Sequence, residues 1–349
     1  MGVVNIQKTY GSGAKDVLRF LDGTMTSFIC PKDIDEIYDY TFYDMTSLQN
    51  VKIGDNVTQI KQYAFYGCNN VVEWETPRYL TSVGDRAFAE SAKNGIYIDF
   101  NFNNTTIGAY AFYGSHLKNL IGYINNVGSY AFRGSGARDY SFTNLKIDGN
   151  VGSFAFLGRY TGQGFFIDGS SNITNIEEGA FCIVSNDSYY VPVYHVLDFR
   201  GSTFTSLPGN TFGRTDIRTM GLLRAAIYFP TSLVSISNYV FEGHKMCYYY
   251  FSNITPCLLG AYAFSDIIQW GGIFVPYNNI NTYKTATNWT SVSQYIKGWA
   301  PENTFSVGET LPTVNQEGYG LTWYTDRECT TQISVVVDAD VELYCVAST

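Results

Sequence analysis

Three histidines are the residues of this chain best suited to metal binding or proton transfer, but their spacing supports neither. His116, His195 and His244 stand far apart in the 349-residue sequence, and no HxH or HxxxH pair could place two imidazoles on one ion. We interpret them as strand or surface histidines. From them we expect no catalytic residue, no metal ligand and no cofactor.

Two short stretches have the composition of an ion site without its full pattern. GSGAK at 11–15 has two glycines and a lysine but lacks the GxxxxGK[ST] frame that wraps a phosphate, so we interpret it as a loop. Asp338, Asp340 and Glu342 alternate along an expected strand and would share one face, where calcium is conceivable. A solvated strand face is the favoured interpretation, and no metal site is predicted.

Clustered carboxylates are what the most serious enzymatic alternative, a polysaccharide-processing solenoid, would need. Glu73 and Glu75 flank Trp74 on one expected strand, and Asp99 lies on the next. We expect no lysine or arginine at the same register. The chain is therefore predicted not to be an enzyme, and these three carboxylates are kept as candidate binding residues.

Aromatic residues on expected strands support binding better. Alternate residues of a strand face opposite sides of a sheet, so at least one tyrosine of CYYYF at 247–251 must face outward. We select Tyr249, together with Tyr97 and Phe166, because the repeat described below requires no aromatic residue at these positions. Exposed rings on a rigid sheet can bind a saccharide or a protein surface. The alternative is that these rings only stack on one another.

Charge and hydropathy exclude several classes of partner. The formal net charge is −9 with only 22 Lys and Arg, so no basic stripe is available for nucleic acid or for an anionic membrane surface. No run of 18 apolar residues predicts membrane insertion. The opening MGVVNIQKTYGSGAKDV does not resemble a secretory signal, so either a leader was removed or the protein is not exported that way. Seven scattered cysteines without a CxxC pair indicate small buried residues.

The elements that must position these residues come from a repeat. The string IKQYAFYGC at 60–68 returns in ten registers, spaced 20 to 31 residues apart. Its phenylalanine is Phe42, Phe65, Phe88, Phe112, Phe132, Phe156, Phe181, Phe212, Phe241 and Phe264. An aliphatic residue always stands five positions earlier, and a small or β-branched residue directly precedes the ring. A period in the low twenties is typical of a solenoid.

The repeat predicts a mainly β solenoid of about ten coils of 20 to 31 residues. Short β-type runs between the registers, such as GIYIDF at 95–100, would give each coil one strand of a parallel sheet. The phenylalanines should stack as a ladder through the core. Gly67, Gly114, Gly134, Gly158 and Gly243, each two residues after the ring, should adopt positive φ where the chain turns.

Residues 26–278 resemble the BspA-like leucine-rich repeat family. The resemblance rests on the pattern aliphatic-xxx-Ala-Phe-x-Gly-Cys of Ile60–Cys68, followed by VVEWETP. Residues 1–25 would then form an N-terminal cap. Residues 279–300 would form a helical C-terminal cap in which Ile280, Tyr283 and Thr287 share the face that covers the last coil.

The tail, residues 301–349, resembles the Listeria-Bacteroides repeat, a small separate β-module of internalin-type surface proteins. The match is carried by Gly308, Leu311, Pro312, Gly318, Tyr319, Trp323, Tyr324, Asp326, Leu343 and Tyr344. The sequence departs from that pattern in a glycine-aromatic stretch one residue shorter than usual, and in Val346 and Ala347, where Ala and Trp are expected.

These resemblances imply a non-catalytic bacterial recognition or adhesion protein that binds a protein or glycan on a cell surface. Its location would be extracellular or on the cell surface if a leader was removed. The alternative is a tail-associated, receptor-binding or structural protein of a phage virion, because virions assemble in a reducing cytoplasm where cysteines stay unpaired. The candidate binding residues are Tyr97, Asp99, Phe166, Tyr249, Glu73 and Glu75, and the oligomeric state is left open.

Overall fold

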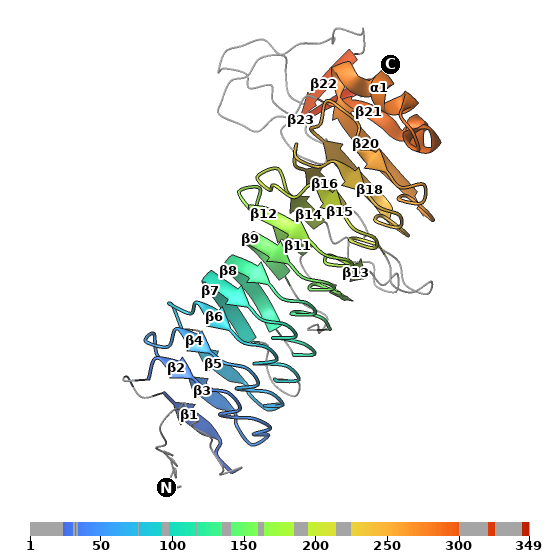
Figure 1. Cartoon of the computed structure of the whole chain (residues 1–349). Helices are drawn as coiled ribbons and strands as arrows, with labels where there is room; N and C mark the ends of the chain where they lie inside the picture. The colour runs from blue at the N-terminus through green and yellow to red at the C-terminus, as the bar shows by residue number, and fades with distance from the viewer. Residues whose placement is uncertain are drawn as a thin grey trace, which may run out of the picture.

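The computed structural model describes residues 24–30, 32, 34–75, 77–92, 98–115, 117–134, 141–159, 164–184, 195–213, 225–267, 269–299, 320–324 and 344–348. The chain winds through stacked coils from one end of an elongated molecule to the other (Figure 1). The structure confirms the predicted parallel-sheet solenoid, because neighbouring coils pair strand to strand in parallel.

One sheet of thirteen strands runs the length of the stack, and all of its pairings are parallel. Its strands are β2 (Glu36–Ile37), β4 (Gln59–Ile60), β6 (Ser82–Val83), β7 (Ile98–Ile107), β8 (Leu117–Val127), β9 (Ser141–Val151), β11 (Gly164–Ile167), β12 (Ile173–Ile176), β14 (His195–Asp198), β16 (Ala225–Phe229), β18 (Lys245–Phe251), β20 (Gln269–Pro276) and β21 (Ile296–Trp299).

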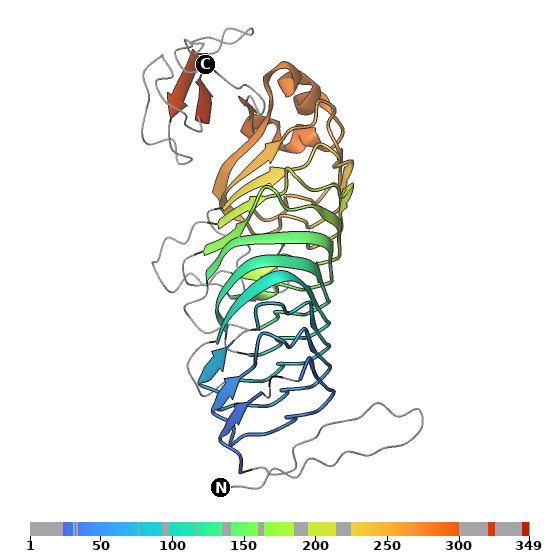
Figure 2. The ribbon, with the colours of Figure 1, turned by 90° about the vertical axis from the view of Figure 1, so that its left-hand side faces the viewer.

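Most coils contribute two strands, not the single strand that was predicted. The additional small sheets are β1 (Ser27–Ile29), β3 (Asn50–Lys52) and β5 (Glu73–Glu75); β15 (Ser206–Leu207), β17 (Ser235–Ile236) and β19 (Leu258–Leu259); and β10 (Gly158–Arg159) with β13 (Ile183–Val184). In the middle coils β7, β8 and β9 are long and curve around the stack (Figure 2). They bend without breaking because Asn104, Asn126 and Gly149 take positive φ there.

The predicted phenylalanine ladder forms the core. All ten rings stack in sequence order, with centroids 4.7 to 5.9 Å apart. The residue before each ring is buried where two coils approach. From the second register on, its carbonyl accepts the N–H of the ring residue in the preceding coil, as Ala64 does from Phe42 at 2.7 Å. Only a small or compact side chain fits there, which explains the Ala, Thr or Val of the repeat.

The predicted positive φ is confirmed at Gly67, Gly114, Gly134 and Gly243, which have φ values of 63° to 72°. It is wrong at Gly158. That residue begins β10 and pairs in register with Ile183, so its backbone is extended.

A second left-handed position was not predicted. The residue two before each ring takes positive φ in every coil but the last, although most of these residues are not glycine. The non-glycine examples, with φ of 52° to 62°, are Tyr40, Tyr63, Arg86, Tyr110, Tyr130, Phe154, Asn210 and Tyr239. A bulky residue rarely adopts this conformation, so sequence preference gave no signal for it.

The C-terminal cap is shorter in helix than predicted. It consists of η1 (Tyr277–Asn279), α1 (Ile280–Thr285) and η2 (Trp289–Tyr295), and then β21 extends the main sheet. Ile280 and Tyr283 are buried as expected, but Thr287 is exposed because the helix ends at Thr285. The fully buried Trp289 packs against Tyr283 instead, with ring centroids 4.9 Å apart.

The cap also satisfies the open edge of the last coil. Trp289 Nε1 donates to the Cys257 carbonyl at 2.8 Å, and Asn288 Nδ2 donates to the Leu259 carbonyl at 2.5 Å. Cys257 directly precedes β19 and Leu259 is its last residue, and β19 is the edge strand of its sheet. The cap therefore prevents β19 from pairing with a strand of another chain. Beyond the cap, the described strands β22 (Gly320–Tyr324) and β23 (Tyr344–Ser348) pair antiparallel.

Candidate binding surface

The predicted alternation of CYYYF is confirmed, but the tyrosine selected from it is wrong. In β18 Cys247, Tyr249 and Phe251 are buried, whereas Tyr248 and Tyr250 are half-buried on the outer face. Tyr249 faces the core, where its ring lies 4.8 Å from that of Phe241.

His244 explains why a tyrosine can occupy this inward position. Its Nε2 lies 2.9 Å from the Phe212 carbonyl and must donate to it, so Nδ1 accepts the Tyr249 hydroxyl at 2.9 Å. Burial lowers the pKa of His244 to about 4, so the imidazole is neutral at pH 7. The buried hydroxyl is therefore satisfied by a group on the corner before the strand, which strand alternation does not reveal.

His195 has a similar structural role. It lies buried in β14, as a strand histidine was expected to, and its Nδ1 accepts the Phe165 N–H at 3.1 Å. Burial lowers the pKa of His195 to about 4. His116 lies outside the described residues.

An outer aromatic row, defined as Tyr228, Tyr250 and Phe274, lies on the outer face of the main sheet. The three residues are paired neighbours on β16, β18 and β20. Their rings stack at 4.5 Å and 4.8 Å. Trp299 of β21 meets Tyr250 edge-on at 5.1 Å, and its Nε1 donates to the Phe251 carbonyl.

Both ends of this row are closed by cations. The Arg200 guanidinium lies 4.9 Å from the Tyr228 ring centre and is held by Asp198 at 2.7 Å, and the Lys297 ammonium lies 5.9 Å from the Phe274 ring centre. The ring faces are thus occupied by neighbours. Tyr228 and Phe274 are themselves buried, so the partly exposed members of this surface are Tyr250, its neighbour Tyr248 and Trp299. Partly exposed aromatic side chains of this kind suit contact with a ligand.

Phe166 packs beside this row. It is half-buried against Val196, Ala226 and Tyr228, on the face opposite the core. Its predicted outward orientation is confirmed, and it belongs to the same outer cluster. Tyr97 lies outside the described residues, and so does the side chain of Asp99, although the backbone of Asp99 lies in β7.

The acidic strand β5 differs from its prediction. Glu73 and Glu75 are exposed as expected, while Trp74 points inward and meets Phe65 and Phe88 edge-on. A lysine does occupy their register, however. Lys52 of β3 pairs with Glu75 in the sheet, and its ammonium lies 3.9 Å from Glu73. The sequence analysis missed this lysine because it assigned one strand to each coil and so did not predict the short sheet of β1, β3 and β5.

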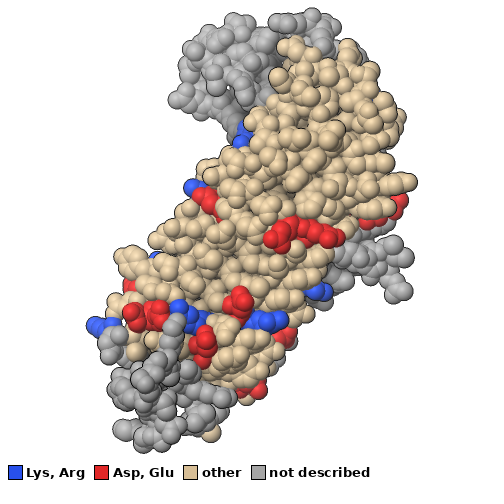
Figure 3. All heavy atoms as spheres, in the orientation of Figure 1, with Lys and Arg blue, Asp and Glu red and all other residues tan. Residues whose placement is uncertain are grey.

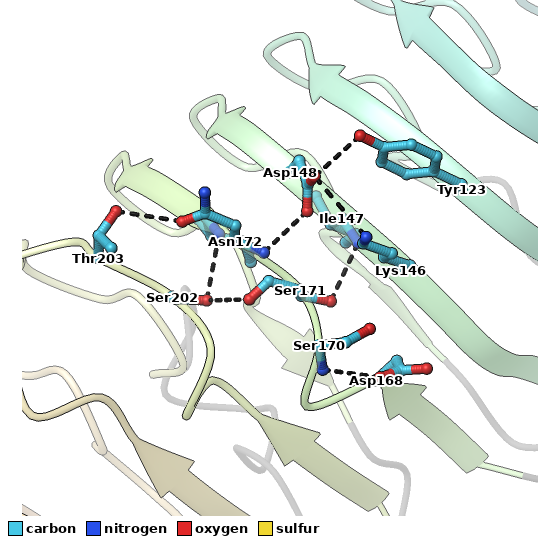
Figure 4. Close-up of polar contacts among 11 residues, drawn as sticks. Tyr123, Lys146, Ile147, Asp148, Asp168, Ser170, Ser171, Asn172, Ser202 and Thr203 are labelled. Carbon is cyan, nitrogen blue, oxygen red and sulfur yellow. Dashed lines mark hydrogen bonds and ion pairs between the residues drawn. The ribbon is translucent and has the colours of Figure 1, made fainter.

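A polar ladder crosses the middle coils (Figure 4). Asp148 accepts hydrogen bonds from the Tyr123 hydroxyl and the Asn172 N–H, both at 2.8 Å. The hydrogen bond to Asp148 raises the pKa of Tyr123. Thr203 donates to Asn172 at 3.2 Å, so the ladder continues into the next coil. The two contacts of the Asp148 carboxylate therefore join three successive coils. Across the described part of the chain, no three His, Cys, Asp or Glu residues lie close enough to hold a metal ion.

Charged side chains are few on much of the surface. On the face shown in Figure 3 they gather over the N-terminal coils, and the C-terminal coils are almost free of them. The outer aromatic row lies on strands of these C-terminal coils. Within the described residues, no helix is long and apolar enough to cross a membrane.

Comparison with known proteins decides the family. The sequence model of the BspA type leucine-rich repeat region matches residues 19–137 and 223–295 in six copies, more than half of the chain. The chain belongs to this family. The BspA-type ladder nevertheless continues between the two matched stretches, through Phe156, Phe181 and Phe212. The match ends at residue 295, so the resemblance of the tail to the Listeria-Bacteroides repeat stays a prediction.

Two further comparisons add little to this assignment of a BspA-type repeat. A leucine-rich repeat protein from Bacteroides ovatus ATCC 8483 is 12% identical, covering 79% of this chain and 84% of its own, with a TM-score of 0.22. A score this low carries no structural argument, and the fold follows from this chain's own strand pairings. No curated protein matches the sequence.

Proposed function

We propose that this BspA-type repeat protein is a non-catalytic recognition protein that binds a protein or glycan on a cell surface through the outer aromatic row. The proposal is supported by the half-buried Tyr248, Tyr250 and Trp299, which lie on the outer face of the sheet. Their rings pack on the buried Tyr228 and Phe274. Tyrosine, tryptophan and arginine are the residues that most often dominate binding energy. The solenoid holds them in fixed positions, so little freedom is lost on binding.

The test compares paired surface variants in one binding assay. Tyr248→Ser with Tyr250→Ser removes two outer hydroxyl-bearing rings, and Tyr239→Ser with Tyr262→Ser removes two exposed rings from a different surface. Labelled protein is applied to a glycan array and to intact bacterial and host cells. We expect the first pair to lower binding at least about tenfold and the second to leave it unchanged. Equal binding by both pairs would contradict the proposal.

Catalysis is tested with the same ligands. Any glycan that binds is incubated with the protein, and new reducing ends are measured. We expect none. Glycan cleavage that depends on Glu73 or Glu75 would contradict the non-catalytic proposal and favour a polysaccharide-processing enzyme.

A phage virion protein could use the same surface to bind its receptor. The five described cysteines, Cys30, Cys68, Cys182, Cys247 and Cys257, are all buried thiols. They are therefore compatible with a virion assembled in a reducing cytoplasm, and equally with a surface protein whose thiols are sequestered. Detection of the native protein in purified particles would favour the virion, and detection on intact cells would favour the adhesion protein.

A further inference from the structure

A second aromatic surface lies on the corner turns of the N-terminal coils, not on the strands of the main sheet. We call it the corner ridge and define it as Arg86, Tyr110, Tyr113, Tyr130 and Arg133. These residues stand two before or one after a ladder phenylalanine. All are at least partly exposed.

Two rings of the ridge stack, a third is tilted against them, and an arginine lies beside the rings at each end. Tyr110 and Tyr130 stack at 4.9 Å, and Tyr113 lies 5.6 Å from Tyr110. The Arg86 guanidinium carbon lies 4.5 Å from the Tyr110 ring centre. That of Arg133 lies 5.2 Å from Tyr130 and 6.0 Å from Tyr113.

Neither arginine has a carboxylate partner among the described residues. Arg86 donates one side-chain hydrogen bond, from Nη1 to the Tyr63 hydroxyl at 3.1 Å, and neither arginine takes part in an ion pair with any described residue. Arg200, by contrast, is bound through two nitrogens to Asp198. Two unpaired guanidinium groups on one surface are unexpected in a chain with 31 acidic residues.

The geometry holds each guanidinium without using up its donors. A cation–π contact does not consume the N–H donors of a guanidinium. The donors of Arg133 and those that Arg86 does not give to Tyr63 therefore stay available to a carboxylate or sulfate. Arg86, Tyr110 and Tyr130 also have left-handed backbones, and their N–H groups are bonded to the following coil. The ridge is therefore ordered before any ligand arrives, which lowers the entropy lost on binding.

We propose that the corner ridge binds an acidic polysaccharide. Arg86 and Arg133 would each bind one carboxylate or sulfate group, and the tyrosine hydroxyls would hydrogen-bond to sugar hydroxyls between them. The rings of Tyr110 and Tyr130 are stacked on neighbours, so they form no pocket of the kind that selects a peptide side chain. Its groups recur with the coils, which suits a polymer whose acid groups also recur.

The site is distinct from the outer aromatic row, and the experiment separates the two. The full chain is tested against immobilised polygalacturonate, dextran sulfate, neutral dextran and polyglutamate at low and high salt. We expect binding to one or both acidic polysaccharides, weakened by salt, and none to neutral dextran. Arg86→Gln with Arg133→Gln should lower this binding at least about tenfold.

Arg78→Gln is the matched control. Arg78 is also an exposed arginine of the N-terminal coils, but it is already paired with Asp55, so we expect its loss to change binding less than about twofold. Arg86→Lys keeps the charge without the planar fork and should retain only part of the affinity. Tyr248→Ser with Tyr250→Ser should leave polysaccharide binding intact, whatever it does to cell binding. Thermal melting verifies that each variant is folded.

Three results would overturn the proposal. The first is undiminished polysaccharide binding by the Arg86 and Arg133 double variant. The second is equal binding to neutral dextran. The third is arginine-dependent binding to polyglutamate that exceeds binding to both acidic polysaccharides, which would assign the ridge to an acidic peptide instead.

Discussion

Tyr239 shows how single residues in this fold tolerate an uncommon backbone. Its φ is 62°, a conformation that disfavours an L-residue by about 1 kcal/mol. Stacking on the Tyr262 ring, 5.8 Å away, and an N–H bond to the Tyr262 carbonyl offset that cost. Arg86 takes the same conformation between two tyrosine rings.

Replacing Tyr239 should therefore reverse the usual order of two small residues. Both Tyr239→Ala and Tyr239→Gly lose the stack, but only glycine adopts positive φ without strain. We expect the glycine variant to be more stable than the alanine variant by about 1 kcal/mol, measured by urea unfolding. If alanine proves the more stable, left-handed strain at the corner is not what these positions resist.

At the scale of the coil, the sequence predicted what the repeat itself imposes and missed what depends on contacts between coils. The phenylalanine ladder, its preceding small residue and the inward aliphatic follow from one periodic pattern. The inward turn of Tyr249 depends on His244, and the pairing of Lys52 with Glu75 depends on a second sheet. Neither is visible in the period, because each arises from which residues of different segments the coils happen to superpose.

The ladder should be tested at its middle. Phe112 is fully buried, with Phe88 at 5.2 Å on one side and Phe132 at 5.3 Å on the other. We expect Phe112→Ala to lower the free energy of unfolding by about 3 to 5 kcal/mol through the cavity it leaves. Phe112→Leu should be milder. Unchanged thermal and denaturant stability in the alanine variant would show that the phenylalanine ladder does not stabilise the fold.

Backbone contact between coils gives an independent test. A Cβ on Gly128 would lie 2.5 Å from the backbone of Ala109 and Gly108, whereas a Cβ on Gly54 would meet nothing within 4 Å. We expect Gly128→Ala to destabilise by about 1 to 3 kcal/mol. Gly54→Ala should be neutral or stabilise by about 0.4 to 1 kcal/mol, because it restricts the unfolded chain. Equal effects in chemical denaturation would show that the coils can separate locally.

For the whole molecule, stability is the sum of coils and the interfaces between them. The two described histidines lie at such interfaces. His195 of β14 accepts a hydrogen bond from Phe165 of β11, and His244 donates to the Phe212 carbonyl of the preceding coil. Both histidines are uncharged in the folded protein at neutral pH, so we expect acid to lower the free energy of unfolding.

The pH dependence follows from the direction of the two pKa shifts. Burial lowers the pKa of His195 and His244 from 6.5 to about 4, so between these values the unfolded chain binds more protons than the folded one. Stability is full above pH 6.5 and falls as the pH decreases, with a limiting slope of about 1.4 kcal/mol per pH unit for each histidine. Urea unfolding between pH 7 and 5 measures it, above the range where most carboxylates titrate.

His244→Gln is the comparison variant, and it should reduce the pH slope to about half of the wild-type slope. A flat profile in the wild-type protein would contradict the neutral buried state. A slope that is equally steep in the variant would assign the acid sensitivity to other groups.

Five buried thiols are distributed along the same stack. Cys30 and Cys68 lie in the first coils, Cys182 lies near the middle, and Cys247 and Cys257 lie near the cap. Burial shields these thiols from an alkylating reagent, and it raises the pKa of Cys68, Cys247 and Cys257 to about 12, so little reactive thiolate forms. We therefore expect alkylation only when the surrounding coil opens. The order in which mass spectrometry finds these cysteines alkylated would show which coils unfold first, without any engineered probe.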